Sequence, residues 1–393
     1  MTPSARVQAA IELLDLVIDA ARSGAAAADT LIARYFKERR YAGSKDRRAV
    51  RELVYRAIRR AGDIPASGRA AMLGLVADDP ELADLFDGSA HGPAALSGGE
   101  LTAAAGVVPT WLHPLLDPLL GADELPALLE RAPLDLRANR LRGTREEALA
   151  ALPMAAPTPH SPLGLRLPEG FQVEETDAWR SGLIEVQDEG SQLLALACAA
   201  RPGELVIDLC AGAGGKTLAL AAQMDNRGRL VASDTDRGRL SRMPVRLQRA
   251  GATIVEPLLL DPTREASALA SLAGTVDLVL IDAPCSGSGT WRRNPETRWR
   301  LTPKRLEQVT ALQSRLLDVG ADLLKPGGRI VYAVCSLLAA EGREQAEAFT
   351  RRSSVRPQHI NLEAGRAAGT GRLLSPARDG TDGFFLACWS RPC

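Results

Sequence analysis

The first third of the chain has the hydrophobic spacing of helices. Between Val7 and about Ala127, apolar residues recur three or four positions apart, which places them on one face of a helix. No stretch in this range shows a convincing strand pattern. The pattern therefore predicts an all-helical domain over residues 1–127. The residues that carry it most clearly are Ile11, Leu14, Val17, Ile18, Val50, Leu53, Val54 and Ile58.

Residues 128–185 have a different character. LDLRANRLRG (134–143) is typical of a strand, and TREEALAAL (144–152) is typical of a helix with Thr144 as its N-cap. PMAAPTPHSPLG (153–164) is a proline-rich loop. The segment predicts a small α+β module between two larger domains.

From residue 186 to 393, short β-branched runs alternate with helical stretches. This alternation predicts an α/β domain whose sheet is mostly parallel and has helices on both faces. The predicted strands are LVIDLC (205–210), RLVASD (229–234), TIVEPLLLD (253–261), VDLVLIDAP (276–284), RIVYAVCS (329–336) and GFFLACWS (383–390).

Composition and charge limit how the chain could bind a polyanion such as RNA. The 48 basic and 48 acidic residues balance, so binding to a polyanion must depend on local patches. One such cluster lies between residues 34 and 60, where eleven basic residues face only Glu38, Asp46 and Glu52. It suits phosphate contacts in RNA, or it is a solvated helix face. The basic residues are Arg34, Lys37, Arg39, Arg40, Lys45, Arg47, Arg48, Arg51, Arg56, Arg59 and Arg60.

The six cysteines and four histidines do not form a metal or disulfide pattern. No CxxC pair occurs, so we expect no structural zinc and no disulfide framework. The opening residues lack a basic region followed by an apolar core, and no run approaches about 18 apolar residues, so neither a signal peptide nor a membrane span is expected. These features predict a reduced, cytoplasmic protein without a bound metal.

The strongest local motif is the glycine-rich turn DLCAGAGGKT (208–217), between a strand and an apolar helix. A P-loop requires glycine where Cys210 stands, and a dinucleotide fingerprint requires a third glycine where Thr217 stands. The turn best suits a cofactor with ribose hydroxyls and no phosphate. The candidate cofactor residues in the turn are Cys210, Ala211, Gly212, Ala213, Gly214, Gly215 and Lys216.

Carboxylates at the ends of the following strands indicate more closely which cofactor the turn would bind. Asp234 ends the next strand, where it can accept hydrogen bonds from both ribose hydroxyls, and Asp261 and Asp282 end the two after it. Together with Asp208, they form a row of acids that repels phosphate and tolerates a sulfonium ion. We therefore expect S-adenosyl-L-methionine as cofactor. The alternative is that these acids only cap the following helices.

Two cysteines lie just past the carboxyl ends of hydrophobic strands. Cys285 follows VDLVLIDAP, and Cys335 follows RIVYAV, so neighbouring strands would bring both thiols to one substrate. A thiolate that adds to C6 of a pyrimidine makes C5 nucleophilic enough to be methylated, and a base must then remove the C5 proton. Asp282 could hydrogen-bond N3 and the exocyclic amine of cytosine. The alternative is that both cysteines are structural.

The segment after the first cysteine is rich in arginine and tryptophan. Its indole and guanidinium groups suit contacts with unstacked RNA bases, unless the tryptophans face the core. We interpret it as an RNA contact formed by Trp291, Arg292, Arg293, Arg298, Trp299, Arg300, Lys304 and Arg305.

These ordered motifs resemble the Sun family of RNA cytosine-5 methyltransferases. VQDEGSQL (186–193), DLCAGAGGKT, DAPCSGSGTWRRNPETRW (282–299), YAVCS (332–336) and DGFFLA (382–387) carry the resemblance, with PTWL (109–112) and LDLRANRL. The helical part, through QAAIELLDLV (8–17) and KDRRAVRELVYRAIRR (45–60), resembles the NusB-like RNA-binding domain fused to bacterial members that modify 16S rRNA. The turn departs from the usual CAAPGGK, and Gly342 stands where the family prefers Asn.

The resemblance implies a Rossmann-like core with a mostly parallel seven-stranded sheet, Cys335 as nucleophile and Cys285 as the residue that assists product release. Spacing alone leaves these roles open, because DNA cytosine methyltransferases use the Pro-Cys cysteine as nucleophile. We expect 16S rRNA as substrate and a monomeric enzyme. The alternatives are a tRNA cytosine-5 methyltransferase and a NusB-like RNA-binding factor with a decayed catalytic domain.

Overall fold

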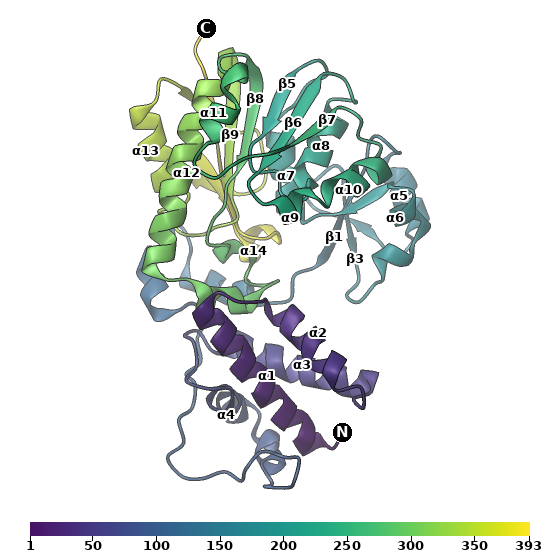
Figure 1. The fold of residues 1–393 in the computed structure, drawn as a ribbon, viewed down its shortest axis with the longest axis vertical. Helices are drawn as coiled ribbons and strands as arrows, with labels where there is room; N and C mark the ends of the chain where they lie inside the picture. The colour runs from purple at the N-terminus through teal and green to yellow at the C-terminus, as the bar shows by residue number, and fades with distance from the viewer. The chain divides into compact units, whose positions relative to one another are not determined.

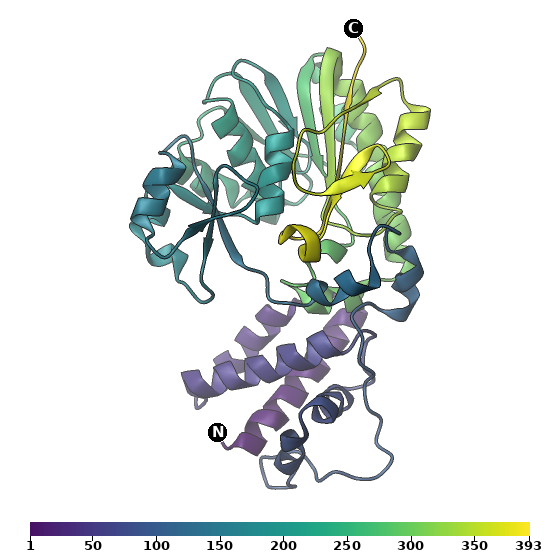
Figure 2. The same ribbon diagram turned by 180° about the vertical axis from the view of Figure 1, so that it is seen from behind.

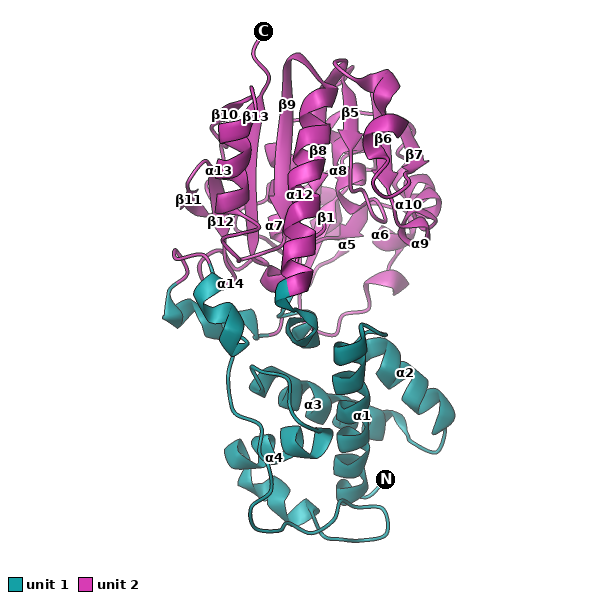
Figure 3. Cartoon of the chain, turned by 60° about the vertical axis from the view of Figure 1, so that its left-hand side comes forward, with its two compact units in different colours: residues 1–116, 121–130, 290–303 teal, residues 117–120, 131–289, 304–393 magenta.

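The computed structural model describes residues 1–393, which divide into two compact units (Figure 3). The helical unit comprises residues 1–116, 121–130 and 290–303, and the sheet unit comprises residues 117–120, 131–289 and 304–393. The α+β module predicted over 128–185 falls mainly within the sheet unit. The sequence-based division at 127 and 185 stays a prediction.

Helices form only the first part of the helical unit. Thr2 caps the first helix by accepting a hydrogen bond from the Ala5 N–H, and Gly24 ends it in the left-handed conformation (φ 72°). Between residues 79 and 130 the helical unit contains only short 3-10 helices, which differs from the helical prediction up to residue 127. Glycine and proline recur in this stretch and interrupt regular helix. The helices are α1 (Pro3–Ser23), α2 (Ala28–Glu38), α3 (Ser44–Arg60) and α4 (Gly68–Asp78).

A small four-stranded sheet opens the sheet unit. Its strand order is β2-β3-β1-β4, with antiparallel pairing throughout. The predicted strand and helix are both confirmed, and Thr144 accepts a hydrogen bond from the Glu147 N–H at 3.1 Å as an N-cap. The other strands were not predicted. The elements are β1 (Leu134–Ala138), α5 (Arg145–Ala151), β2 (Ala156–Pro157), β3 (Gly164–Leu167), α6 (Asp177–Arg180) and β4 (Ile184–Val186).

The main sheet has nine strands in the order β11-β12-β13-β9-β8-β5-β6-β7, with β10 also paired to β13. All six predicted strands are confirmed, and β5 to β9 are parallel. Three strands of three or four residues, β10, β11 and β12, were not predicted, so the sheet has more than the expected seven strands. The strands are β5 (Leu205–Asp208), β6 (Arg229–Asp234), β7 (Val255–Leu259), β8 (Val276–Asp282), β9 (Leu324–Val334), β10 (Arg356–Gln358), β11 (Arg366–Ala368), β12 (Gly371–Leu374) and β13 (Phe384–Ser390).

Helices cover both faces of this sheet (Figures 1 and 2). Alternate residues of β8 point to opposite faces: Leu278 and Leu280 join the core with α7 and α8, whereas Val279 and Ile281 lie against Gly320 of α12. The α/β fold with a Rossmann-like core is therefore confirmed. The helices are α7 (Glu189–Ala197), α8 (Gly215–Gln223), α9 (Arg237–Leu240), α10 (Met243–Ala250), α11 (Glu265–Ala268), α12 (Pro303–Leu323), α13 (Arg343–Arg352) and α14 (Pro376–Asp379).

The arginine- and tryptophan-rich segment lies inside the helical unit. Trp291 and Arg298 are fully buried, and the Arg298 guanidinium donates to the carbonyl oxygens of Ile58, Arg59 and Ala61 at the end of α3. Trp299 packs into the core of this unit. The RNA-contact interpretation is therefore wrong for Trp291, Arg292, Arg298 and Trp299, all of which are buried.

Candidate active site

The carboxyl edge of the parallel strands collects the predicted acids. Asp208, Asp234 and Asp282 are the last residues of β5, β6 and β8, which are neighbours in the sheet. Asp261 follows β7 farther along the same edge and is exposed. The helix-capping alternative fails for all four, because the N-caps of α8, α9 and α11 are other residues and no helix directly follows β8.

The glycine turn has the backbone that its sequence requires. Gly212 and Gly214 adopt left-handed conformations, with φ of 56° and 87°, which favour glycine. The Gly212 N–H donates to Asp234 Oδ2 at 2.7 Å, so the turn is fixed to the end of β6. A Cβ added to Gly215 would meet no atom within 4 Å, so the turn borders open space.

Two ionisable side chains of the turn, Lys216 and Asp208, form hydrogen bonds with other residues of the site. Lys216 Nζ donates to Asp282 Oδ2 at 2.7 Å. Burial opposes the charge of Lys216, but the Asp282 carboxylate outweighs this effect and raises its pKa. Asp208 accepts a hydrogen bond from the Thr217 hydroxyl at 2.7 Å, and burial raises the pKa of Asp208 to about 7. The other carboxylate oxygen of Asp208 is buried without a hydrogen-bond partner.

The two candidate cysteines meet at the same edge. Strands β8 and β9 are parallel neighbours, and Cys285 Sγ lies 3.3 Å from Cys335 Sγ. Both residues are half-buried. The hydrogen bond to Cys335 and burial raise the pKa of the Cys285 thiol well above its usual value. The structure thus brings together two thiols from separate motifs.

Cys210 differs from these two cysteines. It belongs to the glycine turn, and burial followed by the nearby Asp208 and Asp234 carboxylates raises the pKa of its thiol. A thiol held protonated among carboxylates suits a lining group better than a nucleophile.

Sequence reasoning missed a buried polar cluster behind the two cysteines. Glu341 is fully buried and accepts hydrogen bonds from Ser286, Ser336 and Gln313. A serine directly after each cysteine was the available signal. The departure at Gly342 also has a structural reason, because a Cβ there would lie 2.8 Å from the Phe385 ring.

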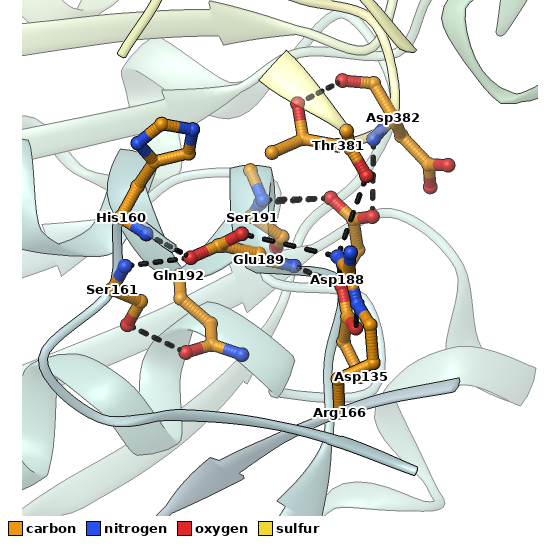
Figure 4. A network of polar contacts seen from close by, with 12 residues as sticks. Asp135, His160, Ser161, Arg166, Asp188, Glu189, Ser191, Gln192, Thr381 and Asp382 are labelled. Atoms are coloured by element: carbon orange, nitrogen blue, oxygen red, sulfur yellow. Dashed lines mark hydrogen bonds and ion pairs between the residues drawn. The ribbon is translucent and has the colours of Figure 1, made fainter. Parts of the chain in front are cut away.

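The VQDEGSQL and DGFFLA motifs support this edge through a polar network (Figure 4). Asp188 caps α7, and its other oxygen accepts from the Asp382 N–H at 3.1 Å. Glu189 accepts from the His160 and Ser161 N–H groups at 2.6 and 2.7 Å, so the network also reaches the small sheet. These contacts explain the motifs as a scaffold around the site.

The same network continues to the cysteine loop. The Gly383 N–H donates to the Gly289 carbonyl oxygen at 2.8 Å. A Cβ added to Gly289 would lie 2.0 Å from the Gly383 oxygen, so the two backbones can approach this closely only as glycines.

The basic cluster of the helical unit divides into paired and unpaired side chains. Arg51, Arg56 and Arg60 form ion pairs with Asp29, Asp79 and Asp78. Five others are exposed and form no ion pair or hydrogen bond: Arg34, Lys37, Arg40, Lys45 and Arg48. They lie on α2, α3 and the connection between them.

Two further observations concern what the structure lacks. No helix combines the length and apolar character needed to cross a bilayer. No group of three or more His, Cys, Asp or Glu side chains is arranged to hold a metal ion.

Comparison with known proteins identifies the family. Residues 195–390, which contain the glycine turn and both cysteines, match the sequence model described as 16S rRNA methyltransferase RsmB/F. The chain belongs to this family. One RsmB/F relative is the ribosomal RNA small subunit methyltransferase B of Salmonella newport, 35% identical over 267 residues. That match covers 66% of this chain but only 59% of the relative, so the chain spans less than two thirds of its length.

Solved structures support the same assignment of fold. The crystal structure of PH0851 matches with a TM-score of 0.76 at 24% identity and covers 100% of this chain and 99% of that protein. A methyltransferase homologue from Pyrococcus horikoshii matches with a TM-score of 0.61 at 28% identity, over 68% of this chain and 89% of its own. The cofactor implied by the RsmB/F family and this fold is S-adenosyl-L-methionine.

The turn fits that cofactor. The open space beside Gly215 leaves room for a ligand against the backbone, and the edge presents Asp234 and Asp282 in place of the basic groups that a phosphate needs. The unpartnered oxygen of buried Asp208 adds an acceptor directly beneath the turn. A cationic ligand without phosphate therefore suits the site.

Proposed function

We propose that the chain is an S-adenosylmethionine-dependent methyltransferase that modifies C5 of cytosine in RNA, with 16S rRNA as its substrate. The observation that carries this proposal is the pair of thiols 3.3 Å apart at the carboxyl edge of the sheet. Alkylation of an unreactive pyrimidine carbon requires a covalent nucleophile, and a second group must then help to release the product. The name of the Salmonella relative supports rRNA as the substrate.

The residues that would hold the cofactor are those of the turn, Cys210 to Lys216, with Asp234 for the ribose hydroxyls. When bound, the cofactor supplies an electrophilic methyl group. Asp261 stands farther out on the same edge, where it adds negative charge that favours a cation.

Cys335 is the proposed nucleophile. Its thiolate adds to C6 of the target cytosine, and the Cys285 thiol, which stays protonated, donates a hydrogen bond toward it. The addition places electron density on C5, where the methyl group is accepted. A water molecule then takes the C5 proton, the C5–H electron pair reforms the C5–C6 double bond, and the Cys335–C6 bond breaks to release the thiolate. Cys285 assists this last step by donating a hydrogen bond to the departing Cys335 sulfur.

Asp282 is the proposed contact for the base. Lys216 holds one of its oxygens at 2.7 Å, which fixes the carboxylate beside the cysteines. The carboxylate can then hydrogen-bond the exocyclic amine and N3 of a protonated cytosine, and this stabilises the ring during addition.

The proposed RNA-binding surface is the set of five unpaired basic residues on α2 and α3, in agreement with the resemblance to a NusB-like domain. A surface of this kind supplies phosphate contacts without reading sequence. We further propose that the enzyme acts as a monomer in the cytoplasm, where ribosomal RNA is found.

The test uses the full chain, labelled S-adenosylmethionine and purified 16S rRNA. Cys335→Ser should lower methylation by at least about 10³-fold and abolish the covalent protein–RNA adduct, because it removes the nucleophile. Cys285→Ala should accumulate that adduct on denaturing gels, because addition still occurs while release fails. Equal adduct levels in the two variants would show that the roles are assigned wrongly.

Two controls separate the alternative functions. Bisulfite sequencing of rRNA and tRNA from a deletion strain identifies the RNA that loses methylation, so loss confined to tRNA would replace the substrate proposed here. Titration with S-adenosylmethionine addresses a decayed catalytic domain, since a chain without measurable affinity would act only as an RNA-binding factor.

A further inference from the structure

One buried carboxyl group connects the two cysteine loops. Glu341 lies in the connection between β9 and α13 and is completely buried. One of its carboxylate oxygens accepts from the Ser286 N–H at 2.8 Å and from Gln313 Nε2 at 3.0 Å. The other oxygen accepts from the Ser336 hydroxyl at 2.5 Å. Every group that faces this side chain is a donor, as expected for a carboxylate.

Two of the hydrogen-bond partners of Glu341 directly follow the two cysteines in the chain. Ser286 directly follows Cys285, and Ser336 directly follows Cys335. A single side chain therefore bridges the two residues that come next after the thiols. Charge-assisted hydrogen bonds are roughly twice as strong as neutral ones, so each contact of this bridge is stronger than the neutral bond from the Gly289 N–H to the Cys335 carbonyl oxygen (3.0 Å), which also joins the two loops.

The bridge is itself anchored to regular structure. The Tyr332 hydroxyl on β9 donates to the Glu341 carbonyl oxygen at 2.6 Å, which fixes the backbone of Glu341. Gln313 on α12 also donates to the Pro284 carbonyl oxygen at 2.9 Å, one residue before Cys285. The carboxyl group is thus held by a strand on one side and by a long helix on the other.

A serine hydroxyl cluster completes the connection. Ser336 Oγ lies 3.2 Å from Ser286 Oγ and 3.1 Å from Ser288 Oγ, and the Leu337 N–H donates to Ser288 Oγ at 2.9 Å. These contacts are weaker than those to a carboxylate, so they would not by themselves replace the bridge.

We propose that Glu341 is a positioning residue that holds the Cys285 and Cys335 loops in register, so that both thiols face the same pyrimidine. This inference rests on the proposed function, in which Cys335 attacks C6 and Cys285 assists release of the product. Glu341 lies behind the thiols and acts through Ser286 and Ser336, without touching the substrate.

The experiment compares Glu341→Gln with Glu341→Ala in the full chain. In the Gln variant the amide oxygen can still accept from the Ser286 N–H, and the amide NH₂ can donate to Ser336 Oγ, so the bridge is kept without its charge. The Ala variant removes the bridge. Glu265→Ala is a matched control, because Glu265 is also buried and paired, with Arg315, but contacts neither cysteine loop.

The first readout needs no RNA. Mild oxidation with diamide joins two thiols that meet, and mass spectrometry of proteolytic fragments measures formation of the Cys285–Cys335 disulfide. Wild type, Glu341→Gln and Glu265→Ala should form it at rates within about threefold of one another. Glu341→Ala should be slower by about tenfold or more, because the loops lose their mutual effective concentration.

The second readout is methylation. Glu341→Ala should lower kcat by about 10²-fold with little change in KM for RNA, because misplaced reacting groups impair the chemical step and not binding. Glu341→Gln should restore most of kcat. If Glu341→Ala does not fold, Ser336→Ala removes only the Cys335 side of the bridge and should slow both readouts to an intermediate extent.

The outcomes distinguish the two proposals. Unchanged disulfide formation in Glu341→Ala, or in Ser336→Ala if that variant is used, would overturn the positioning role even if methylation is confirmed. A Gln variant as impaired as the Ala variant would also overturn it, since charge and not the bridge would then matter. If wild type methylates no RNA, the proposed function fails, while the disulfide comparison still tests the bridge.

Discussion

Residues 282–289 and 290–303 follow one another in the chain, and the sequence suggested a functional role for both. They differ in the burial of the side chains that suggested it. The first stretch leaves its cysteine half-exposed at the carboxyl edge of the sheet. The second belongs to the helical unit and buries Trp291, Arg298 and Trp299. Position at a strand end therefore predicted a side chain that reaches the surface, whereas arginine- and tryptophan-rich composition did not.

Arg298 has a structural role, although its charge had suggested an RNA contact. Its Nη2 nitrogen donates to three carbonyl oxygens at the C-terminal end of α3, where carbonyl groups lack intrahelical N–H partners. Burial lowers the pKa of Arg298 to about 9, which reflects the cost of removing the charge from water. The segment therefore stabilises the helical unit.

The largest expected effect is that of Arg298→Ala, which tests whether residues 290–303 stabilise the helical unit. The substitution removes the Arg298 donor from the Ile58 and Arg59 carbonyl oxygens, whereas the Ala61 oxygen still accepts from Trp299 Nε1. It should therefore lower the free energy of unfolding of the helical unit by about 3 kcal/mol. Hydrogen exchange of the α3 amides measures this loss. Arg34→Ala, at an exposed position of α2, is the control and should leave exchange unchanged.

RNA affinity completes that test. Below the unfolding temperature, Arg298→Ala should bind RNA within about twofold of wild type, because a buried guanidinium makes no phosphate contact. Weaker RNA binding with unchanged α3 exchange would return residues 290–303 to the RNA interface.

A smaller effect is expected at the unpaired basic surface. The triple variant Arg34→Ala, Lys37→Ala and Arg48→Ala should weaken RNA binding by about tenfold near physiological salt and reduce the slope of log affinity against log salt by about 2. Thermal unfolding should stay the same, since none of these side chains has a partner to lose. Filter binding at several salt concentrations measures both quantities.

The control for this variant is Arg229→Ala. Arg229 is equally exposed but pairs with Glu256 and begins β6, at the amino end of the parallel strands and away from the site. An equal loss of affinity in the control would show that binding follows total charge and not this surface.

Much of the fold was accessible from the sequence, because long apolar strands and a glycine turn are local signals. All six predicted strands of the main sheet are present, and the adjacency of β8 and β9 brings the two cysteines together. The strands β10, β11 and β12 were not predicted, since a period of two cannot be read from three or four residues.

The remainder of the site depended on contacts between distant residues. Gln313 and Ser286 lie 28 and 55 positions from Glu341, and nothing local marks their hydrogen bonds to it. The burial of Arg298 likewise depends on carbonyl groups about 240 positions away. Such arrangements follow from tertiary packing, which a single sequence does not display.

The smallest expected effect concerns Asp208. Like Arg298 it is a buried ionisable residue, but one of its carboxylate oxygens has no hydrogen-bond partner, whereas the Arg298 guanidinium has several. Its pKa rises from 3.8 to about 7 in the folded chain, mainly through burial, so the folded state binds the proton more tightly than the unfolded state. The resulting stabilisation is complete below pH 3.8 and is lost as the pH rises through about 7. Asp208→Asn cannot titrate, and its amide oxygen can still accept the Thr217 hydroxyl.

The variant should therefore gain stability relative to wild type as the pH increases. Between about pH 5 and pH 8.5, the difference in Tm between Asp208→Asn and wild type should grow by about 2–4 °C in favour of the variant. Differential scanning calorimetry measures this difference, and other titrating groups cancel because both proteins contain them. Asp177→Asn, at a fully exposed side chain, should show no such trend. Parallel pH profiles for Asp208→Asn and wild type would mean that Asp208 stays ionised throughout, and that the turn stabilises its charge as well as α3 stabilises that of Arg298.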